Sequence, residues 1–368
     1  MKLLIQPGDS IMPLVNGINS ATSSVEIVIF RFDRSEIERA LANAVKRGVF
    51  VHALIAHKNR SGEDNLRRLE MKLLADGVTV VRSADDLTRY HGKLMIIDRR
   101  ELYLFSFNLT YMDIERSRSF AVITDNQKLV QEAVKLFEAD AKRQAYEAGL
   151  SEFVVSPANA RRQLAEFIKA AKTQLLIYDP KVSDPAMIRL LEERANAGVE
   201  IKIIGRLTQR AAGLAARKLS HLRLHTRTMI RDGTDAFVGS QSLRELELDA
   251  RREVGVIFDD KQAVRALTKT FQDDWIESEQ YTAHREEQAP AVKVAKKLAK
   301  VVVKELPPVS PALADIIKEV AGEEAEVDLT PNELQESIKD AVMAAVQEVV
   351  QDVVEDIVEQ KAEEKPRA

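Results

Sequence analysis

The sequence lacks cysteine, carries few aromatic residues and has no long apolar run. None of its 368 residues is a cysteine, which excludes disulfides and thiolate metal sites and agrees with a reducing compartment. No segment approaches the roughly 20 consecutive apolar residues of a membrane span, and the apolar run before Pro7 is too short for a signal-peptide core. These absences predict a cytoplasmic protein that is at most peripheral to the inner face of a membrane.

An excess of positive charge is also missing. The formal net charge of -4 is unlike that of proteins that coat nucleic acid, so any affinity for anions must be local. Hydrophobic residues make up 45% of the chain, which is ordinary for a soluble α/β protein. At about 150 residues per domain, the length fits two globular units and an appendage.

Two stretches of the chain match each other without a gap. Residues 91–125 align with residues 225–259, and every matched pair is separated by the same number of positions. An ungapped register of this kind indicates two copies of one structural unit. The matched pairs are His91 with His225, Asp98 with Asp232, Ser106 with Ser240 and Asp125 with Asp259.

Each copy is preceded by the same pattern of secondary-structure signals. An apolar, β-rich run comes before a helical segment, whose end is marked by Gly48 in the first copy and by Gly198 in the second. Strand, helix, strand and motif strand predict an α/β fold of two similar lobes, each a mixed β-sheet flanked by helices. We place the first lobe at residues 1–148 and the second at residues 149–284.

The rest of the chain predicts a helical C-terminal extension. Residues 285–330 are expected to be a linker that contains a basic amphipathic helix, because five lysines share one helical face within 291–304. This face either keeps the linker soluble or binds anions such as the headgroups of an anionic membrane. Residues 331–368 begin at a capping box and predict an acidic amphipathic helix and tail, whose apolar stripe within 333–363 suggests self-association.

The residue types in each copy suit a phosphate group. On a strand, residues two apart face the same side, so His91 and Lys93 project together, as do Ser106 and Asn108. Phosphodiester cleavage needs a nucleophile, an acid for the leaving oxygen, and cations for the nonbridging oxygens. One copy supplies a single histidine. Two copies face to face supply the nucleophile and the acid from different lobes, so the chemistry requires the duplication.

The spacing His-x-Lys-x4-Asp, followed by Ser-x-Asn, is similar to the HKD motif of the phospholipase D superfamily, over roughly residues 1–284. The resemblance implies two phospholipase D-like lobes, a covalent phosphohistidine, a second histidine that acts as general acid and then base, and catalysis with neither a metal nor a cofactor. It implies a phosphoric diester hydrolase of phospholipase D type that acts on a phospholipid headgroup or another phosphodiester, with transfer to an alcohol as an alternative to hydrolysis.

Three positions depart from the pattern of this superfamily. Arg227 replaces the motif lysine in the second copy, where it keeps the charge but changes the donor geometry. Ser242 stands where asparagine is usual, and Phe105 stands in the first copy where glycine is usual. A non-catalytic protein that holds a phosphate would explain all three changes, although both histidines are retained.

A carboxylate is expected to orient one of the two histidines. Glu253 lies where the superfamily often places a carboxylate that orients its own histidine, which here is His225. The equivalent first-copy position is Ser119, where Asp113 or Glu115 would have to substitute. The identity of the nucleophile stays open, because this carboxylate favours the second histidine whereas the more standard motif favours the first.

The sequence thus gives three groups of candidate residues. The motif aspartates have the opposite parity to their histidines on a strand and are expected to make structural hydrogen bonds. The motif serines either bond the backbone in a turn or contact phosphate, and we expect the phosphate contact. The catalytic candidates are His91, His225, Lys93, Arg227 and Glu253; the phosphate-binding candidates are Ser106, Asn108, Ser240 and Ser242; the structural members are Asp98 and Asp232.

A second class of substrate uses the same chemistry. A nuclease-type phosphodiesterase would act on DNA or RNA, although the 5% aromatic content and the lack of an evident basic stripe weigh against it. The sequence does not decide between water and an alcohol as the acceptor, nor does it give the oligomeric state.

Overall fold

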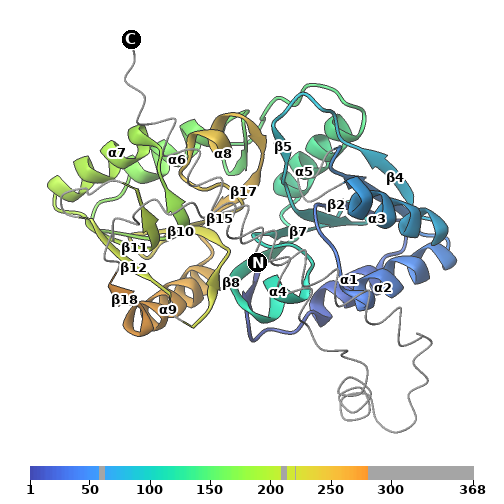
Figure 1. Cartoon of the computed structure of the whole chain (residues 1–368), viewed down its shortest axis with the longest axis horizontal. Coiled ribbons are helices and arrows are strands. Elements are labelled where there is room, and N and C mark those ends of the chain that lie inside the picture. Colours follow the sequence, from blue (N-terminus) through green and yellow to red (C-terminus); the bar gives the residue numbers. More distant parts are fainter. Residues whose placement is uncertain (58–62, 209–213, 220, 281–368) are drawn as a thin grey trace, which may run out of the picture. The chain divides into compact units, whose positions relative to one another are not determined.

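A computed structural model describes residues 1–57, 63–208, 214–219 and 221–280 (Figure 1). The basic helix expected within 285–330 and the acidic helix expected within 331–368 lie outside the described residues. The described residues all belong to one structural unit, so the two lobes can be placed against each other.

Both lobes contain the succession of strand, helix, strand and motif strand that the sequence pattern predicts. The first lobe contains β1 (Lys2–Gln6), α1 (Met12–Ser20), β2 (Ser24–Ile29), α2 (Ser35–Lys46), β3 (Phe50–Ile55), α3 (Glu63–Ala75), β4 (Thr79–Arg82), β5 (Arg89–Tyr90), β6 (Leu94–Ile97), β7 (Glu101–Phe105), α4 (Tyr111–Glu115), β8 (Ser117–Thr124) and α5 (Gln127–Ala141). The second contains β9 (Phe153–Val155), α6 (Ala160–Lys169), β10 (Gln174–Val182), α7 (Pro185–Asn196), β11 (Glu200–Leu207), β12 (Ala215–Lys218), β13 (Arg223–Leu224), β14 (Arg227–Arg231), β15 (Asp235–Gly239), α8 (Glu245–Asp249), β16 (Arg251–Arg252), β17 (Val254–Phe258), α9 (Lys261–Glu277) and β18 (Glu279–Gln280).

Each lobe is built on one mixed sheet, and the two sheets share one strand order. The first sheet runs β1-β8-β7-β6-β2-β3-β4, with β13 beside β8, and the second runs β18-β12-β11-β10-β14-β15-β17-β9. Traced from β9, the second sheet runs β9-β17-β15-β14-β10-β11-β12, and these strands correspond in order to β1-β8-β7-β6-β2-β3-β4 of the first sheet. This match confirms the predicted α/β fold of two similar lobes.

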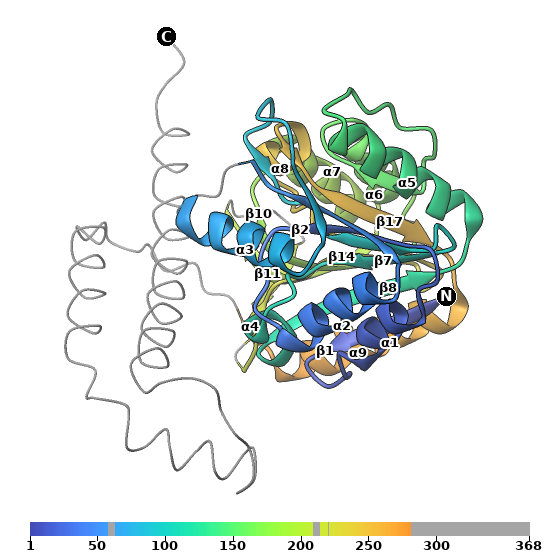
Figure 2. The ribbon, with the colours of Figure 1, turned by 90° about the vertical axis from the view of Figure 1, so that its right-hand side faces the viewer.

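The lobes meet in a hydrophobic core that both sheets share. Alternate residues of β6 face different cores, because successive side chains of a strand point to opposite faces. Leu94 and Ile96 join the shared core, whereas Met95 and Ile97 join a core confined to the first lobe. Side chains of α5 and α9 also pack into the shared core, and the views in Figures 1 and 2 place these helices in different lobes. Burial of this common apolar surface fixes one lobe against the other.

Two short strands cross from one lobe to the other immediately before the motifs. In the first lobe β5 pairs in parallel with β16 of the second lobe, and β13 of the second lobe pairs in parallel with β8 of the first. Each motif histidine follows the crossing strand of its own lobe. The fold therefore carries both histidines to the boundary between the lobes.

The two motif aspartates anchor hairpin turns. Asp98 and Asp232 follow β6 and β14 with left-handed φ angles of 51° and 52°, a conformation that aspartate tolerates better than most residues. Asp98 accepts hydrogen bonds from the backbone N–H groups of Thr22, Ser23 and Ser24, at 2.7–3.1 Å. Asp232 accepts the equivalent bonds in the second lobe from residues 172–174. Both side chains thus tie a turn to the start of the neighbouring strand.

Substitution of a turn aspartate is expected to destabilise the fold in a pH-dependent way. Asp98→Ala should lower the free energy of unfolding by about 1–2 kcal/mol at neutral pH, because charge-assisted hydrogen bonds are lost and solvent weakens them. Burial alone would raise the pKa of Asp98, but the backbone donors outweigh burial and lower it. The stabilisation is therefore present above the unfolded-state pKa and disappears as the pH falls through the folded-state pKa. Urea unfolding at neutral and acidic pH measures the difference.

The matched control for this substitution is Asp85→Ala. Asp85 is an exposed aspartate of the same lobe, so its loss should leave stability nearly unchanged. An Asp98→Ala penalty that persisted at full size in acid would contradict the role given to the carboxylate.

Candidate active site

The two histidines and the two basic residues of the motifs gather where the crossing strands enter the opposite lobe. His91 follows β5 and Lys93 directly precedes β6, whereas His225 follows β13 and Arg227 begins β14. Both histidines are nearly buried, with exposed fractions of 7% and 6%. Arg227 of the second lobe is close enough to lower the pKa of both His91 and Lys93 of the first. The two copies thus meet around one site, as two-histidine chemistry requires.

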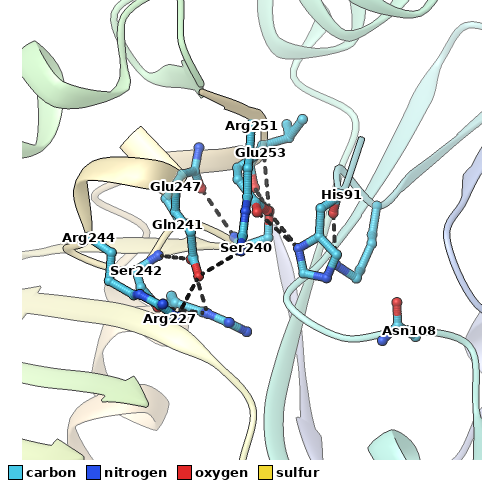
Figure 3. A network of polar contacts seen from close by, with 12 residues as sticks. His91, Asn108, Arg227, Ser240, Gln241, Ser242, Arg244, Glu247, Arg251 and Glu253 are labelled. Carbon is cyan, nitrogen blue, oxygen red and sulfur yellow. Dashed lines mark hydrogen bonds and ion pairs between the residues drawn. The ribbon is translucent and has the colours of Figure 1, made fainter. Parts of the chain in front are cut away.

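His91 is held by a carboxylate of the second lobe. Its Nδ1 lies 2.9 and 3.0 Å from the two carboxylate oxygens of Glu253, as Figure 3 shows. A carboxylate accepts the Nδ1–H, so Nε2 is left with its lone pair. The ammonium Nζ of Lys93 lies 2.9 Å from that Nε2 and donates to the His91 backbone oxygen at 2.8 Å. The lone pair of His91 Nε2 therefore faces the side-chain nitrogen of Lys93.

His225 is held by a carboxylate of the first lobe. Its Nδ1 lies 2.9 Å from Oδ1 of Asp113 and 2.9 Å from Nη1 of Arg223. The same Arg223 nitrogen donates to Asp113 Oδ1 at 2.7 Å. The Nδ1 atom of His225 thus faces both an acceptor and a donor, whereas that of His91 contacts a carboxylate.

The prediction that Glu253 orients His225 is wrong, because each carboxylate contacts the histidine of the opposite lobe. Glu253 orients His91 rather than the histidine of its own copy, and Asp113 takes the role at His225. The pairing of β5 with β16 explains the first contact, since Glu253 directly follows β16. Ser119, the first-lobe counterpart of Glu253, donates instead to the backbone oxygen of Asp113. The carboxylates that hold the two histidines, Glu253 and Asp113, therefore do not occupy matched positions of the duplication.

Arg227 takes over the backbone contact that lysine makes in the first copy. Its Nη1 donates to the His225 backbone oxygen at 2.8 Å, the same distance as the contact of Lys93 with its own histidine. Its Nε donates to Ser242 Oγ at 3.1 Å, and Glu247 lies 3.9 Å away. Figure 3 shows this cluster beside the His91 pair. The guanidinium thus adds a side-chain contact that the ammonium does not make.

The hydroxyls of the two motif serines accept hydrogen bonds from the backbone of a neighbouring strand. Ser106 Oγ accepts from the backbone N–H of Phe120 at 2.9 Å, and Ser240 Oγ accepts from that of Val254 at 3.1 Å. Both serines have an exposed fraction of 0%. The structure thus favours the backbone alternative over the expected phosphate contact of Ser106 and Ser240, because their hydroxyls are already engaged away from solvent.

Asn108 and Ser242 occupy equivalent positions and bind equivalent carboxylates. The backbone and side-chain nitrogens of Asn108 both donate to Asp113 Oδ2 at 2.8 Å, and the backbone N–H of Ser242 donates to Glu247 Oε2 at 2.7 Å. The Asn108 Oδ1 atom is buried and has no hydrogen-bond partner. Asn108 therefore also orients the carboxylate that holds His225, a role that sequence analysis did not assign to it.

Burial sets the protonation states of the site. Burial, together with Lys93 and Arg89, lowers the pKa of His91 well below its ordinary value. Burial, only partly offset by Asp113, lowers the pKa of His225 to about 4. Burial also lowers the pKa of Lys93 to about 7. Both imidazoles are thus neutral near pH 7 in the free protein, and the lysine is poised to gain charge beside an anion.

Sequence analysis missed two arginines and one carboxylate of the site. Arg223 contacts His225, and Arg89, its counterpart in the first copy, lies 4.5 Å from the ring centre of Phe30, which packs against His91. Glu247 is the counterpart of Asp113 and pairs with Arg227. All three occupy matched positions of the duplication, so extending the alignment beyond residues 91–125 would have found the arginines.

The described part of the chain offers no cluster of three His, Cys, Asp or Glu side chains that could hold a metal ion. Among its helices, none combines the length and the apolar character that a membrane crossing needs.

Comparison with known proteins identifies a family whose model matches both lobes. A family model described as "Cardiolipin synthase, PLD-like domain" matches residues 14–141 and 164–275. Polyphosphate kinase 1 of Chlorobaculum tepidum is 28% identical over 225 residues, which are 55% of this chain and 32% of that protein. The mitochondrial cardiolipin hydrolase of Danio rerio is 29% identical over 133 residues, which are 34% of this chain and 56% of that protein. The chain spans about a third of the length of the polyphosphate kinases that it matches.

Solved structures show the same fold. The polyphosphate kinase of Porphyromonas gingivalis superimposes with a TM-score of 0.65 at 19% identity, over 82% of this chain and 55% of that one. The phosphatidylserine synthase of Haemophilus influenzae superimposes with a TM-score of 0.57 at 13% identity, over 79% of this chain and 90% of that one. At these identities the likeness establishes the architecture of the two lobes.

Because each carboxylate contacts the histidine of the opposite lobe, its substitution should affect that histidine and not the one in its own lobe. Glu253→Gln should change the imidazole nitrogen signals of His91 and leave those of His225 in place, and Asp113→Asn should do the reverse. Asp113→Asn should also lower the pKa of His225 further, because the Asp113 charge raises that pKa against burial. Nitrogen-detected NMR of the histidine side chains, followed as a function of pH, measures both effects.

Glu115→Gln provides the matched control. Glu115 was a candidate partner in the sequence, but in the structure it pairs with Arg34 on the surface of the first lobe. Its loss should leave both histidines unchanged. A response of His225 to Glu253→Gln equal to that of His91 would contradict the crossed arrangement.

Proposed function

The chain belongs to the phospholipase D-like family, and from that premise we propose that it cleaves a phosphodiester through a covalent phosphohistidine, with His91 as the nucleophile and His225 as the proton donor. The observation that carries the proposal is the pair of buried imidazoles, each with Nδ1 at 2.9 Å from a carboxylate of the opposite lobe. This arrangement fixes both rings and leaves both Nε2 atoms for chemistry.

The surroundings of the two histidines support this division of roles. Glu253 accepts from His91 Nδ1, so the Nε2 lone pair of His91 is available for attack. At His225, burial lowers the pKa but Asp113 beside Nδ1 partly offsets burial, which favours a second proton on Nε2, the atom that would protonate a leaving oxygen. The more standard motif around His91 also agrees with a nucleophilic role.

The reaction then proceeds in two displacements. The Nε2 of His91 forms a bond to phosphorus while the bond to the leaving oxygen breaks, and that oxygen takes the proton from His225. Water or an alcohol next attacks phosphorus, gives its proton to His225 and releases His91. Lys93 and Arg227 balance the charge on the nonbridging oxygens. The anionic phosphodiester itself would raise the pKa of His225 and of Lys93 and so supply the protonated forms.

The substrate class that we propose is a phospholipid headgroup ester. The family description and the fold shared with a phosphatidylserine synthase support it. A second candidate is a polyphosphate chain, for which the same phosphohistidine would transfer a phosphoryl group. The polyphosphate kinase relatives, which match more than half of this chain, and the additional guanidinium groups of Arg223 and Arg227 support that alternative. DNA and RNA remain further phosphodiesters to compare.

Side-by-side assays should separate the substrate classes. We expect the protein to release choline from phosphatidylcholine vesicles in the presence of EDTA, and His91→Ala and His225→Ala to abolish the release. Consumption of polyphosphate without choline release would establish the second candidate, and nicking of a plasmid would establish a nuclease. A wild-type protein that cleaves none of these substrates, nor bis(p-nitrophenyl) phosphate, would refute the proposed reaction.

The covalent intermediate should accumulate when only its breakdown is blocked. In His225→Asn, we expect bis(p-nitrophenyl) phosphate to give one burst of p-nitrophenolate and a phosphorylated protein, because this leaving group departs with little need for a proton. Mass spectrometry of peptides should locate the adduct on His91. His91→Asn should give neither burst nor adduct. An adduct on His225 in the His91→Asn variant would reverse the roles.

A further inference from the structure

Two arginines at matched positions join the lobes in a reciprocal manner. Arg118 of β8 and Arg252 of β16 are separated by the same number of residues as the two motif histidines. Each sends its guanidinium to an aspartate on a helix of the opposite lobe, and those aspartates, Asp274 of α9 and Asp140 of α5, also occupy matched positions. All four side chains are nearly buried.

The contacts of these arginines repeat each other closely. Arg118 donates to both carboxylate oxygens of Asp274, at 2.7 and 2.8 Å, and to the backbone oxygen of Gln6 at 3.0 Å. Arg252 donates to Asp140 at 3.0 Å and to the backbone oxygen of Ser156 at 3.0 Å. Gln6 and Ser156 end or follow the first strand of each lobe, so each guanidinium links its own lobe to a helix of the other.

The backbone oxygens of the same two arginines hold the motif histidines. The backbone N–H of His91 donates to the oxygen of Arg252 at 2.8 Å, and that of His225 donates to the oxygen of Arg118 at 3.1 Å. Each arginine thus contacts the opposite lobe twice, through its side chain at an aspartate and through its backbone at a histidine. A shift of the arginine side chain would therefore move the backbone oxygen of the same residue, and with it the histidine that donates to that oxygen.

We propose that Arg118 and Arg252 are positioning residues, each of which aligns the histidine of the opposite lobe through its inter-lobe ion pair. The inference rests on the proposed roles of His91 and His225. Arg252 supports the nucleophile, and its neighbour Glu253 holds the ring of the same histidine. Arg118 supports the proton donor.

The alternative is that these ion pairs only hold the lobes together. Buried pairs of this kind leave an uncompensated charge when one partner is lost, so a general loss of stability would affect both histidines alike. The positioning role predicts a division instead: a change at Arg252 impairs the attack by His91, and a change at Arg118 impairs the proton transfers of His225. Displacement of a catalytic group by about 1 Å is enough to slow a reaction about 100-fold.

Pre-steady-state kinetics with bis(p-nitrophenyl) phosphate separate the two effects. Arg252→Lys should slow the initial burst of p-nitrophenolate by about 10- to 100-fold. Arg118→Lys should leave the burst nearly intact and slow the following steady state, because activation of water depends on His225. KM should change little in both variants, since neither arginine touches the phosphate. Equal slowing of both phases by each variant would overturn the proposal.

The variants Asp140→Asn and Asp274→Asn provide an independent pair. They leave both arginines in the sequence and remove only the charge of the partner, so Asp140→Asn should reproduce Arg252→Lys, and Asp274→Asn should reproduce Arg118→Lys. Arg161→Lys is the control, because Arg161 also pairs with aspartate side chains, those of Asp184 and Asp249, but within one lobe. It should leave both phases unchanged.

Histidine NMR keeps the test separate from the proposed function. A wild-type protein that releases no p-nitrophenolate at all would refute the proposed reaction, and the nitrogen signals would still report on alignment. Arg252→Lys should then move the signals of His91 alone, and Arg118→Lys those of His225 alone. Signals that stay in place in both variants, with melting temperatures lowered, would reduce the two arginines to a stabilising role.

Discussion

The hydrogen bond between each histidine and a carboxylate of the opposite lobe is the interaction on which the rest of the site depends. Neither lobe alone provides an oriented imidazole, because Glu253 and Asp113 approach their histidines from across the boundary. The shared core brings the sheets together, and the crossing strands β5 and β13 then bring the motifs to the opposite carboxylates. The packing of the lobes therefore also determines the orientation of the catalytic groups. Lobes that docked incorrectly would leave both imidazoles without their carboxylate partners.

The same burial that orders the site makes its charges costly. Lys93 has an exposed fraction of 3%, and its lowered pKa reflects the penalty for an ammonium in these surroundings. Burial alone would raise the pKa of Asp113, but His225 and Arg223 outweigh it and hold that pKa well below its usual range. In the proposed reaction, the incoming phosphate would add negative charge beside Lys93 and Arg227 and so favour the charged form of the lysine.

The duplication explains why so much of this arrangement follows from the sequence. The constant offset between the two copies predicted two similar lobes and the meeting of His91 with His225, because identical spacing implies identical structure. It could not give the partner of Glu253, since that contact depends on strands that change lobe, and pairing between residues far apart leaves no local pattern. The contact of the Ser106 hydroxyl could not be given for a related reason: its spacing suits phosphate, but only the structure shows that it accepts a hydrogen bond from the backbone N–H of Phe120.

The unequal carboxylates give the site a direction. If two identical subunits formed such a centre, symmetry would make both halves interchangeable, and a substrate could enter in either of two orientations related by the axis. Here the halves differ: Glu253 contacts Nδ1 of one ring, whereas Asp113 and Arg223 both contact Nδ1 of the other. Fusion of the copies into one chain removed the requirement that they remain alike. With the roles proposed for the two histidines, a phosphodiester would bind with a fixed polarity, with its departing portion always on the side of the second lobe, and the two walls of the site would be free to recognise different chemical groups.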